Sequence, residues 1–339
     1  MPHYDALLVV SFGGPEGPDD VLPFLENVVR GRNVPRERLL EVAEHYHHFG
    51  GVSPLNQQNR DLIAALAGEL SNHGIPLPIF FGNRNWQPFL ADTLREMADA
   101  GVRRALALVT SAYSSYSGCR QYREDIQRAQ MAVGAAAPQI DKIRAFFNHP
   151  GFVAATTERV REAFGQLPID RRGKATLLFS AHSIPQSMAV GCAYESQLRE
   201  VGRLVAESLG QPQWELVFQS RSGPPSQPWL GPDVCDALRK IAVDHPQSDI
   251  IIAPIGFLSD HIEVLYDLDF EARQVADELG LHMIRAATVG THPQFIAALR
   301  ELIRERMGNS PQRASTGQLA PTPDVCPEGC CLLARPASG

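Results

Sequence analysis

The stretch ATLLFSAHSIP at residues 175–185 decides the fold of this chain. Its first half is a short apolar run without polar alternation, which is typical of a strand that is buried on both faces of a parallel sheet. Similar runs predict strands at Ala6–Phe12, Leu77–Phe81, Ala105–Val109, Ile143–Phe147, Ala175–Ser180, Leu216–Gln219, Ile250–Phe257 and His282–Ala286. Amphipathic segments with helical spacing lie between them, at Arg60–Leu70, Gln87–Ala100, Ser196–Leu209 and Val264–Leu279. This alternation predicts an α/β fold with parallel sheets and flanking helices.

The strand pattern restarts near residues 145–170, which indicates two similar α/β domains. We expect an N-terminal domain over residues 1–150 and a C-terminal domain over residues 151–307, whose last helix could pack back on the first domain. Residues 308–339 differ in composition. A stretch rich in Pro, Ser, Thr and Gly, at residues 308–324, precedes the sequence CPEGCCLL at residues 326–333. This composition predicts a flexible linker that tethers a cysteine-rich tail.

The composition excludes several classes of protein. A formal net charge of −7 over 339 residues argues against a general nucleic-acid binder, which needs a basic face. Apolar runs of about 18 residues, as needed for a membrane span, do not occur, and no secretion signal is recognisable before the first strand. We therefore expect a soluble cytoplasmic protein. Its six cysteines are expected to be reduced thiols or metal ligands rather than disulfides.

Candidate functional residues follow the apolar runs, because open α/β sheets bind ligands at the carboxyl ends of their strands. His182 follows ATLLFSA, and the segment SDHIEVLYDLDFEA at residues 259–272 follows IIIAPIGF. That segment spaces Glu263, Asp267 and Glu271 four residues apart. Like charges at this spacing oppose helix formation, but their oxygens could bind a divalent cation.

Structural alternatives remain open for these residues. A lone histidine at a strand end is often a hydrogen-bonded structural residue, and a line of carboxylates is often a solvated helix face. Asp260 and Glu263 also have the spacing of a helix capping box. The glycine-rich stretch FGGPEG at residues 12–17 lacks the spacing of a dinucleotide or phosphate loop, so nucleotide binding is not expected.

Taken together, these blocks resemble the ferrochelatase family over about residues 4–307. The matching segments, in the order of the family, are SFGGPEG, HFGGVSPLNQ, SYSGCRQY, FSAHSIP, FQSRSGPPSQPWLGPDV and PIGFLSDHIEVLYDLD. The resemblance implies two Rossmann-like domains of the class II chelatase fold with a porphyrin cleft between them. It also implies a lyase of heme biosynthesis that takes Fe²⁺ as a substrate and inserts it into a porphyrin.

The resemblance assigns roles by position. It implies that His182 and Glu263 are the catalytic residues, which bind Fe²⁺ and handle protons. It places Ser53 and Tyr122 against the bound porphyrin. Phe12 stands where relatives often have Tyr or Met beside the macrocycle, and because a phenyl ring cannot ligate iron, axial ligation from that side is not expected.

Other positions have weaker assignments. Trp229 would suit a flat ligand, although it could equally belong to the core. Asp267 and Glu271 would form an auxiliary metal path, but Asn85 stands where some relatives have a histidine of that outer site.

The resemblance also bears on which porphyrin is bound. Coproporphyrin III carries four propionates, whereas protoporphyrin IX carries two propionates and two apolar vinyl groups. By resemblance Arg30 and Arg32 lie near the mouth of the cleft, where animal enzymes have a longer apolar lip. Coproporphyrin III is therefore the expected substrate, and protoporphyrin IX is the alternative.

The cysteines of the tail predict a metal centre. Cys326, Cys330 and Cys331 are three thiols that need one more ligand. Some actinobacterial ferrochelatases resemble this chain in having a cysteine after SAHSIP and hold a [2Fe–2S] cluster, so Cys192 is the expected fourth ligand. A four-thiolate zinc site is the alternative. Cys119 and Cys235 are expected to be buried small hydrophobes.

Two other functions are compatible with the sequence. One is a class II chelatase that loads cobalt or nickel, although such sites are generally richer in histidine. The other is a non-catalytic heme carrier or an iron–sulfur redox sensor on the same fold. A monomer is expected because it is the default of the family.

Overall fold

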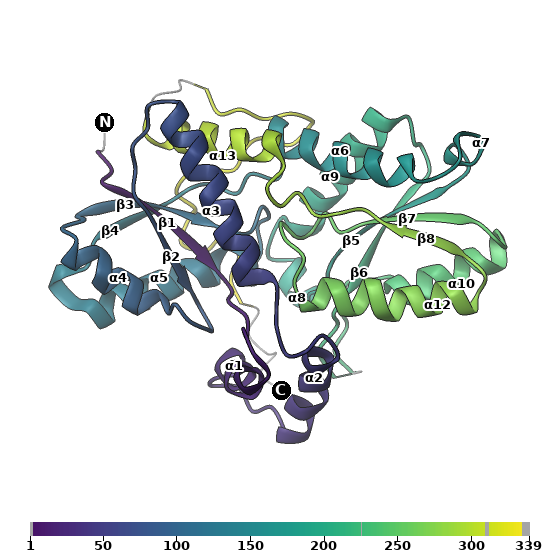
Figure 1. The fold of residues 1–339 in the computed structure, drawn as a ribbon, viewed down its shortest axis with the longest axis horizontal. Coiled ribbons are helices and arrows are strands. Elements are labelled where there is room, and N and C mark those ends of the chain that lie inside the picture. The colour runs from purple at the N-terminus through teal and green to yellow at the C-terminus, as the bar shows by residue number, and fades with distance from the viewer. Residues whose placement is uncertain (1–2, 225, 309–311, 334–339) are drawn as a thin grey trace.

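The computed structural model describes residues 3–224, 226–308 and 312–333, which fold around two parallel sheets (Figure 1). The first sheet has the strand order β2-β1-β3-β4, and the second has the order β6-β5-β7-β8, so the two halves of the chain repeat one topology. The strands are β1 Ala6–Ser11, β2 Ile79–Asn83, β3 Arg104–Val109, β4 Gln139–Lys142, β5 Thr176–His182, β6 Trp214–Gln219, β7 Asp249–Ala253 and β8 His282–Arg285. The predicted α/β fold class is confirmed.

Helices flank both sheets. Those of the first half are η1 Pro18–Asp20, α1 Val21–Val28, α2 Arg36–His48, α3 Leu55–Asn72, α4 Leu90–Asp99, η2 Tyr116–Arg120, α5 Gln121–Val133 and η3 Gly134–Ala136. Those of the second half are α6 Pro150–Gly165, α7 Ile169–Arg172, α8 Gln186–Ala189, α9 Tyr194–Leu209, α10 Val234–Asp244, α11 Ile262–Val264, the π-helix η4 Leu265–Ala272, α12 Arg273–Glu278 and α13 Pro293–Arg306. Within the described residues, none of these helices combines the length and the apolar character that a membrane crossing needs.

Two predicted strand boundaries are wrong. The strand expected at Ile143–Phe147 is Gln139–Lys142. Among the described strands, this one lies at the edge of its sheet and pairs with β3 alone. It therefore tolerates polar, partly exposed residues, whereas the apolar residues after it are buried in the core. The strand that begins at Asp249 ends at Ala253 rather than at Phe257, because Pro254 has no N–H to donate to the sheet.

The junction between the halves is a packed aromatic core. Phe152 makes edge contacts with Tyr113, Phe146 and Phe295, at ring-centroid distances of 6.3, 5.8 and 5.8 Å. The last helix, α13, packs against both α3 of the first half and α6 of the second (Figure 1). A continuous buried core therefore joins the two halves.

His149 stands at this junction and makes stability depend on pH. It is fully buried before α6, and its Nδ1 accepts the backbone N–H of Gly151. Burial, together with the charge of Arg144, lowers the pKa of His149 from 6.5 to about 4. Below pH 6.5 the unfolded chain therefore takes up a proton that the folded chain refuses. We expect stability to fall between pH 6.5 and 4, by at most about 3 kcal/mol from this group.

The replacement His149→Asn isolates this contribution, because asparagine can still cap the helix but does not titrate. Chemical denaturation at pH 7.5 and pH 5 should show a smaller loss of stability in the variant than in the wild type. Equal losses in the two proteins would contradict the assignment.

The tail differs from the predicted flexible linker. Its described part, residues 312–333, has no regular secondary structure but is anchored to both halves. Asn148 donates to the carbonyl of Leu319 at 2.7 Å and accepts the N–H of Thr316 at 2.9 Å. Glu200 of α9 accepts the N–H of Gln318, and Gly317, with φ +86°, permits this approach because a Cβ there would lie 2.2 Å from the Glu200 carboxylate. Buried polar side chains in the two halves thus form hydrogen bonds with the tail.

Candidate functional site

The carboxyl ends of the second sheet bring His182 and Glu263 together. His182 is the last residue of β5, and Glu263 lies in α11, directly before the π-helix η4. The Nε2 atom of His182 is 3.7 Å from a carboxylate oxygen of Glu263, and the two side chains are 33% and 47% exposed. Because the Nδ1–H of His182 donates to the carbonyl of Ser183, its Nε2 is the nitrogen that faces Glu263. The predicted pair therefore forms one partly open site.

The two groups shift each other's pKa values strongly. Burial alone would lower the pKa of His182, but the Glu263 carboxylate outweighs this effect and raises the pKa to about 9. Burial alone would raise the pKa of Glu263, but the charge of His182 lowers it to about 2. At neutral pH the site therefore holds an imidazolium beside a carboxylate, and a cation that enters must compete with the His182 proton.

His261 lies in the candidate segment at residues 259–272, but the sequence assigned it no role in this site. Its Nδ1 accepts the backbone N–H groups of Glu263 and Val264, so His261 rather than Asp260 caps the short helix that carries Glu263. Its Nε2 lies 4.0 Å from the Glu263 carboxylate, and burial lowers the pKa of His261. The only signal in the sequence is its place two residues before Glu263. The capping-box interpretation of Asp260 is wrong, because Asp260 instead forms an ion pair with Arg285 at 3.1 Å.

The π-helix η4 carries the other two predicted carboxylates, Asp267 and Glu271. Asp267 accepts hydrogen bonds from Gln219 at 3.2 Å and from Ser220, which stand at and just after the end of β6. Burial, opposed in part by the Ser220 hydrogen bond, raises the pKa of Asp267 to about 7, and burial also raises the pKa of Glu271. Asp267 can therefore exchange a proton near neutral pH. π-Helical turns often occur at functional sites, where they offset side chains from the ordinary helical face.

The predicted contacts on the first half form two groups. Phe12 and Tyr122 both pack on the guanidinium of Arg84, which lies 5.5 and 4.6 Å from their ring centroids and forms an ion pair with Asp125. Tyr122 is buried, at 5% exposure. Ser53 is buried beside Gly14, where a Cβ would come within 2.8 Å of its hydroxyl. The close packing at Gly14 thus fixes Ser53 beside the loop that follows β1.

The remaining predicted contacts lie around these groups. Trp229 pairs its backbone with Pro185, directly after the His182 segment, and its indole N–H is buried without a hydrogen-bond partner among the described residues. Arg30 and Arg32 are exposed in the loop after α1. The adjacent helix α2 contacts the π-helix of the other half, where His45 stacks on Tyr266 at 3.7 Å between ring centroids. The α1–α2 region therefore reaches across to the helix that follows Glu263.

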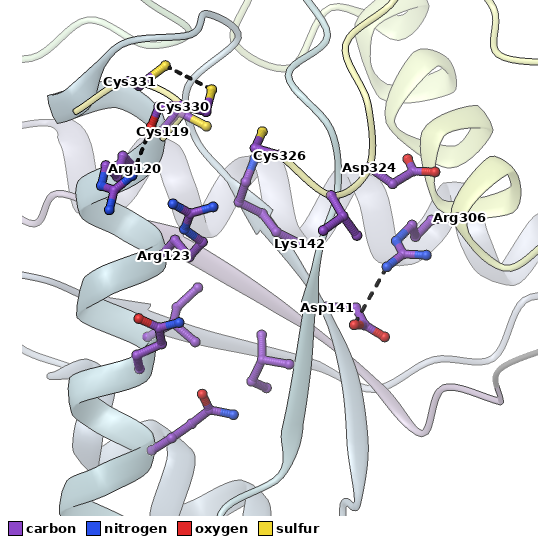
Figure 2. Close-up of a pocket in the computed structure, with 15 residues that line it drawn as sticks. Cys119, Arg120, Arg123, Asp141, Lys142, Arg306, Asp324, Cys326, Cys330 and Cys331 are labelled. Carbon is purple, nitrogen blue, oxygen red and sulfur yellow. Dashed lines mark hydrogen bonds and ion pairs between the residues drawn. The ribbon is translucent and has the colours of Figure 1, made fainter. Parts of the chain in front are cut away.

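A second group of functional side chains surrounds a cavity of about 220 Å³ beneath the tail (Figure 2). Cys119, Cys326, Cys330 and Cys331 line it, whereas Cys192 does not. The Sγ atoms of Cys330 and Cys331 are 3.4 Å apart. The neighbouring Cys326 thiol lowers the pKa of Cys119, and the same interaction raises the pKa of Cys326. The thiols therefore lie as two neighbouring pairs.

Cys119 was not among the ligands expected from the sequence, although it lies in the block SYSGCRQY. It is buried in η2, as expected, but it faces the tail. Cys192 directly precedes α9 and its Sγ contacts the carbonyl of Ala189 at 3.6 Å. Among the described residues, no three His, Cys, Asp or Glu side chains converge closely enough to hold a single metal ion.

Comparison with known proteins gives a consistent result. The family model described as Ferrochelatase matches residues 4–307. The chain is 56% identical to "Ferrochelatase" of Rhodopirellula baltica, with 98% of this chain and 94% of the relative covered. It is 51% identical to "Coproporphyrin III ferrochelatase" of Streptomyces coelicolor, with 98% and 94% covered, and 49% identical to the protein of that name from Nocardia farcinica, with 98% and 97% covered.

Solved structures show the same fold at low sequence identity. SirB from Bacillus subtilis with Fe³⁺ superposes with a TM-score of 0.56 at 13% identity, over 92% of this chain and 99% of that one. CbiX, described as the terminal enzyme for biosynthesis of siroheme in denitrifying bacteria, gives a TM-score of 0.50 at 16% identity, over 88% and 98%. Both are chelatase folds, and at these identities the likeness concerns the fold alone.

Proposed function

Because this chain belongs to the ferrochelatase family, we propose that it inserts Fe²⁺ into coproporphyrin III, with His182 and Glu263 as the residues that meet the iron. The observation that carries the proposal is the His182–Glu263 pair, which stands at the carboxyl ends of the second sheet with both side chains partly open. An imidazole and a carboxylate suit both tasks of the reaction, since each can bind iron and each can accept a proton.

The charges of the site favour an order in which iron binds first and is then inserted into the ring. Fe²⁺ is attracted by the Glu263 carboxylate and displaces the proton that His182 holds at rest, and this proton leaves to solvent on the open side of the site. Insertion then exchanges one divalent cation for the two protons of the pyrrole nitrogens, so the charge in the macrocycle is balanced. Those protons need acceptors near the ring, and the free His182 and Glu263 side chains are both within one site.

Neighbouring groups complete a route for protons and metal. His261 holds the helix start that carries Glu263 and places a second imidazole 4.0 Å from its carboxylate. Asp267, with its pKa of about 7, can release or accept a proton at neutral pH, and Glu271 lies one turn further along η4. We assign Asp267 and Glu271 to the path by which iron enters or protons leave.

Two observations favour coproporphyrin III as the substrate, namely the exposed positive charges of one loop and the names of similar proteins. Arg30 and Arg32 are exposed cations in the loop after α1, where they could pair with the additional propionates. Relatives from Streptomyces and Nocardia at about half identity carry the name coproporphyrin III ferrochelatase. Phe12, Tyr122, Ser53 and Trp229 are assigned to the faces and edges of the macrocycle.

The test is an anaerobic insertion assay with Fe²⁺, in which purified protein receives coproporphyrin III or protoporphyrin IX. We expect a kcat/KM at least about tenfold higher with coproporphyrin III, which corresponds to about 1.4 kcal/mol of preferential binding in the transition state. Arg30→Ala with Arg32→Ala should reduce this preference. A higher kcat/KM with protoporphyrin IX would contradict the substrate assignment, and tight binding without turnover would favour a heme carrier.

For the cysteine cavity we assign a [2Fe–2S] cluster, held by Cys119, Cys326, Cys330 and Cys331. The arrangement fits, because each iron of such a cluster takes two thiolates and the thiols lie as two neighbouring pairs. A single zinc ion instead needs four converging ligands. Cys119 replaces Cys192 in this assignment, since only Cys119 lines the cavity with the three tail thiols. When bound, the cluster would supply a one-electron centre and a cross-link between tail and body. A cytoplasmic location and a monomeric state remain predictions from the sequence.

A further inference from the structure

The cavity that holds the four thiols is also lined by an excess of positive side chains (Figure 2). Four cations face it, namely Arg120, Arg123, Lys142 and Arg306, against the two carboxylates Asp141 and Asp324. Half-buried charges cost free energy unless an opposite charge lies close by.

Two of the four cations are engaged by the protein itself. Arg120 forms an ion pair with Glu124 at 2.8 Å and donates to the carbonyls of Glu328 and Cys330, the latter at 3.0 Å. This arginine thus fastens the cysteine-rich loop to η2, the helix that carries Cys119. Arg306 lies 3.6 Å from Asp141.

The two carboxylates are likewise occupied. Asp141 also accepts Arg104 at 2.6 Å, and Asp324 is paired with Arg313 at 2.6 Å. Both carboxylates therefore already have arginine partners, and neither neutralises Arg123 or Lys142.

Arg123 and Lys142 remain. Within the described part of the chain, neither has a carboxylate within ion-pair distance. Lys142 donates to the carbonyl of Ile143 at 2.9 Å and also lies within hydrogen-bond reach of the Cys119 thiol. Both side chains line the cavity together with Cys119. They come from different elements, α5 and β4, and both are half-buried beside the thiols (Figure 2). An anionic group in the cavity would satisfy both.

We propose that Arg123 and Lys142 are the counter-charges of the cluster and that they raise its reduction potential. This inference rests on the cluster assigned above. An all-thiolate two-iron cluster is an anion that becomes more negative on reduction, so a fixed positive charge stabilises the reduced state more than the oxidised state. Arg123 and Lys142 are positioning and tuning residues here, and they are not ligands.

The experiment is a mediated redox titration of the cluster-loaded, full-length protein, followed by visible absorbance and electron paramagnetic resonance. Lys142→Met and Arg123→Met should each shift the reduction equilibrium towards the oxidised form by about tenfold, which is 59 mV more negative for a one-electron couple. The double variant should shift further. Arg128→Met is the matched control. Arg128 lies on α5, the same helix as Arg123, but it is exposed and paired with Asp125 outside the cavity, so the reduction potential of the cluster in this variant should equal that of the wild type.

The outcomes separate this inference from the cluster assignment. Iron and sulfide analysis of the wild type comes first, and a protein that contains zinc, or no cluster, would overturn both. A loaded wild type whose potential is unchanged in Lys142→Met, in Arg123→Met and in the double variant would overturn only the role of these two cations. If Lys142→Met does not retain a cluster, Arg123→Met and the charge-conserving Lys142→Arg test the role of the two cations instead. Lys142→Arg is expected to keep the reduction potential of the wild type.

Discussion

Replacement of Glu263 by Gln is expected to abolish iron insertion while leaving porphyrin binding nearly unchanged. Glutamine keeps the size of the side chain but removes the charge that attracts Fe²⁺ and that raises the pKa of His182. The variant therefore loses both a metal ligand and a proton acceptor within one site. Since positioned acid–base groups typically contribute factors of 10² to 10⁴, we expect kcat to fall by at least about 100-fold.

Two measurements check this expectation. Single-turnover insertion, followed by the absorbance change of the porphyrin, reports the chemical step. Quenching of porphyrin fluorescence reports binding, and the dissociation constant should stay within about threefold of the wild-type value, because an isosteric change at a polar site removes little apolar contact. Glu278→Gln is a matched control, because Glu278 ends α12 in the same half and accepts a hydrogen bond from the exposed side chain of Gln274. An E263Q variant as active as this control would refute the proposed mechanism.

The second large effect concerns the cluster ligands. Cys119→Ser and Cys330→Ser are each expected to remove the visible absorbance of the cluster, whereas Cys192→Ser should retain it. The reason is geometric, because Cys119 and Cys330 line the same cavity and Cys192 lies outside it. Iron and sulfide content per chain provides a readout that does not depend on enzyme activity.

Loss of the cluster should also weaken the attachment of the tail. Without the cross-link, the tail is held by hydrogen bonds such as those of Asn148 and Arg120. Each kcal/mol lost should lower Tm by about 2–4 °C, so Cys119→Ser and Cys330→Ser should melt earlier than the wild type and Cys192→Ser should not. A Cys192→Ser variant that loses the cluster while Cys119→Ser keeps it would restore the assignment made from the sequence.

Local patterns in the sequence predicted most of the strands and placed His182 and Glu263 among the candidate residues. A strand buried on both faces must be apolar along its whole length, so runs such as ATLLFS are visible without any knowledge of the fold. The carboxyl end of such a strand is where ligands bind, which made His182 and Glu263 candidates before their contact was known. The same reasoning failed at Gln139–Lys142, because an edge strand need not be apolar.

The tertiary structure decided which distant residues share a site. Cys119 and Cys192 both lie in or shortly after segments that match the family, and no local property of the sequence tells which of them faces the tail. Only the path of the tail, anchored by Asn148, Glu200 and Arg120, brings Cys326, Cys330 and Cys331 to Cys119. The cap of the Glu263 helix was likewise decided by backbone geometry, which selected His261 over Asp260. The sequence by itself thus determined the fold class, because burial imposes a local pattern of residue types, and the family resemblance of its motifs named His182 and Glu263 as candidates. The composition of the cysteine cavity was left to the tertiary structure, because contacts between residues far apart in the chain leave no such local pattern.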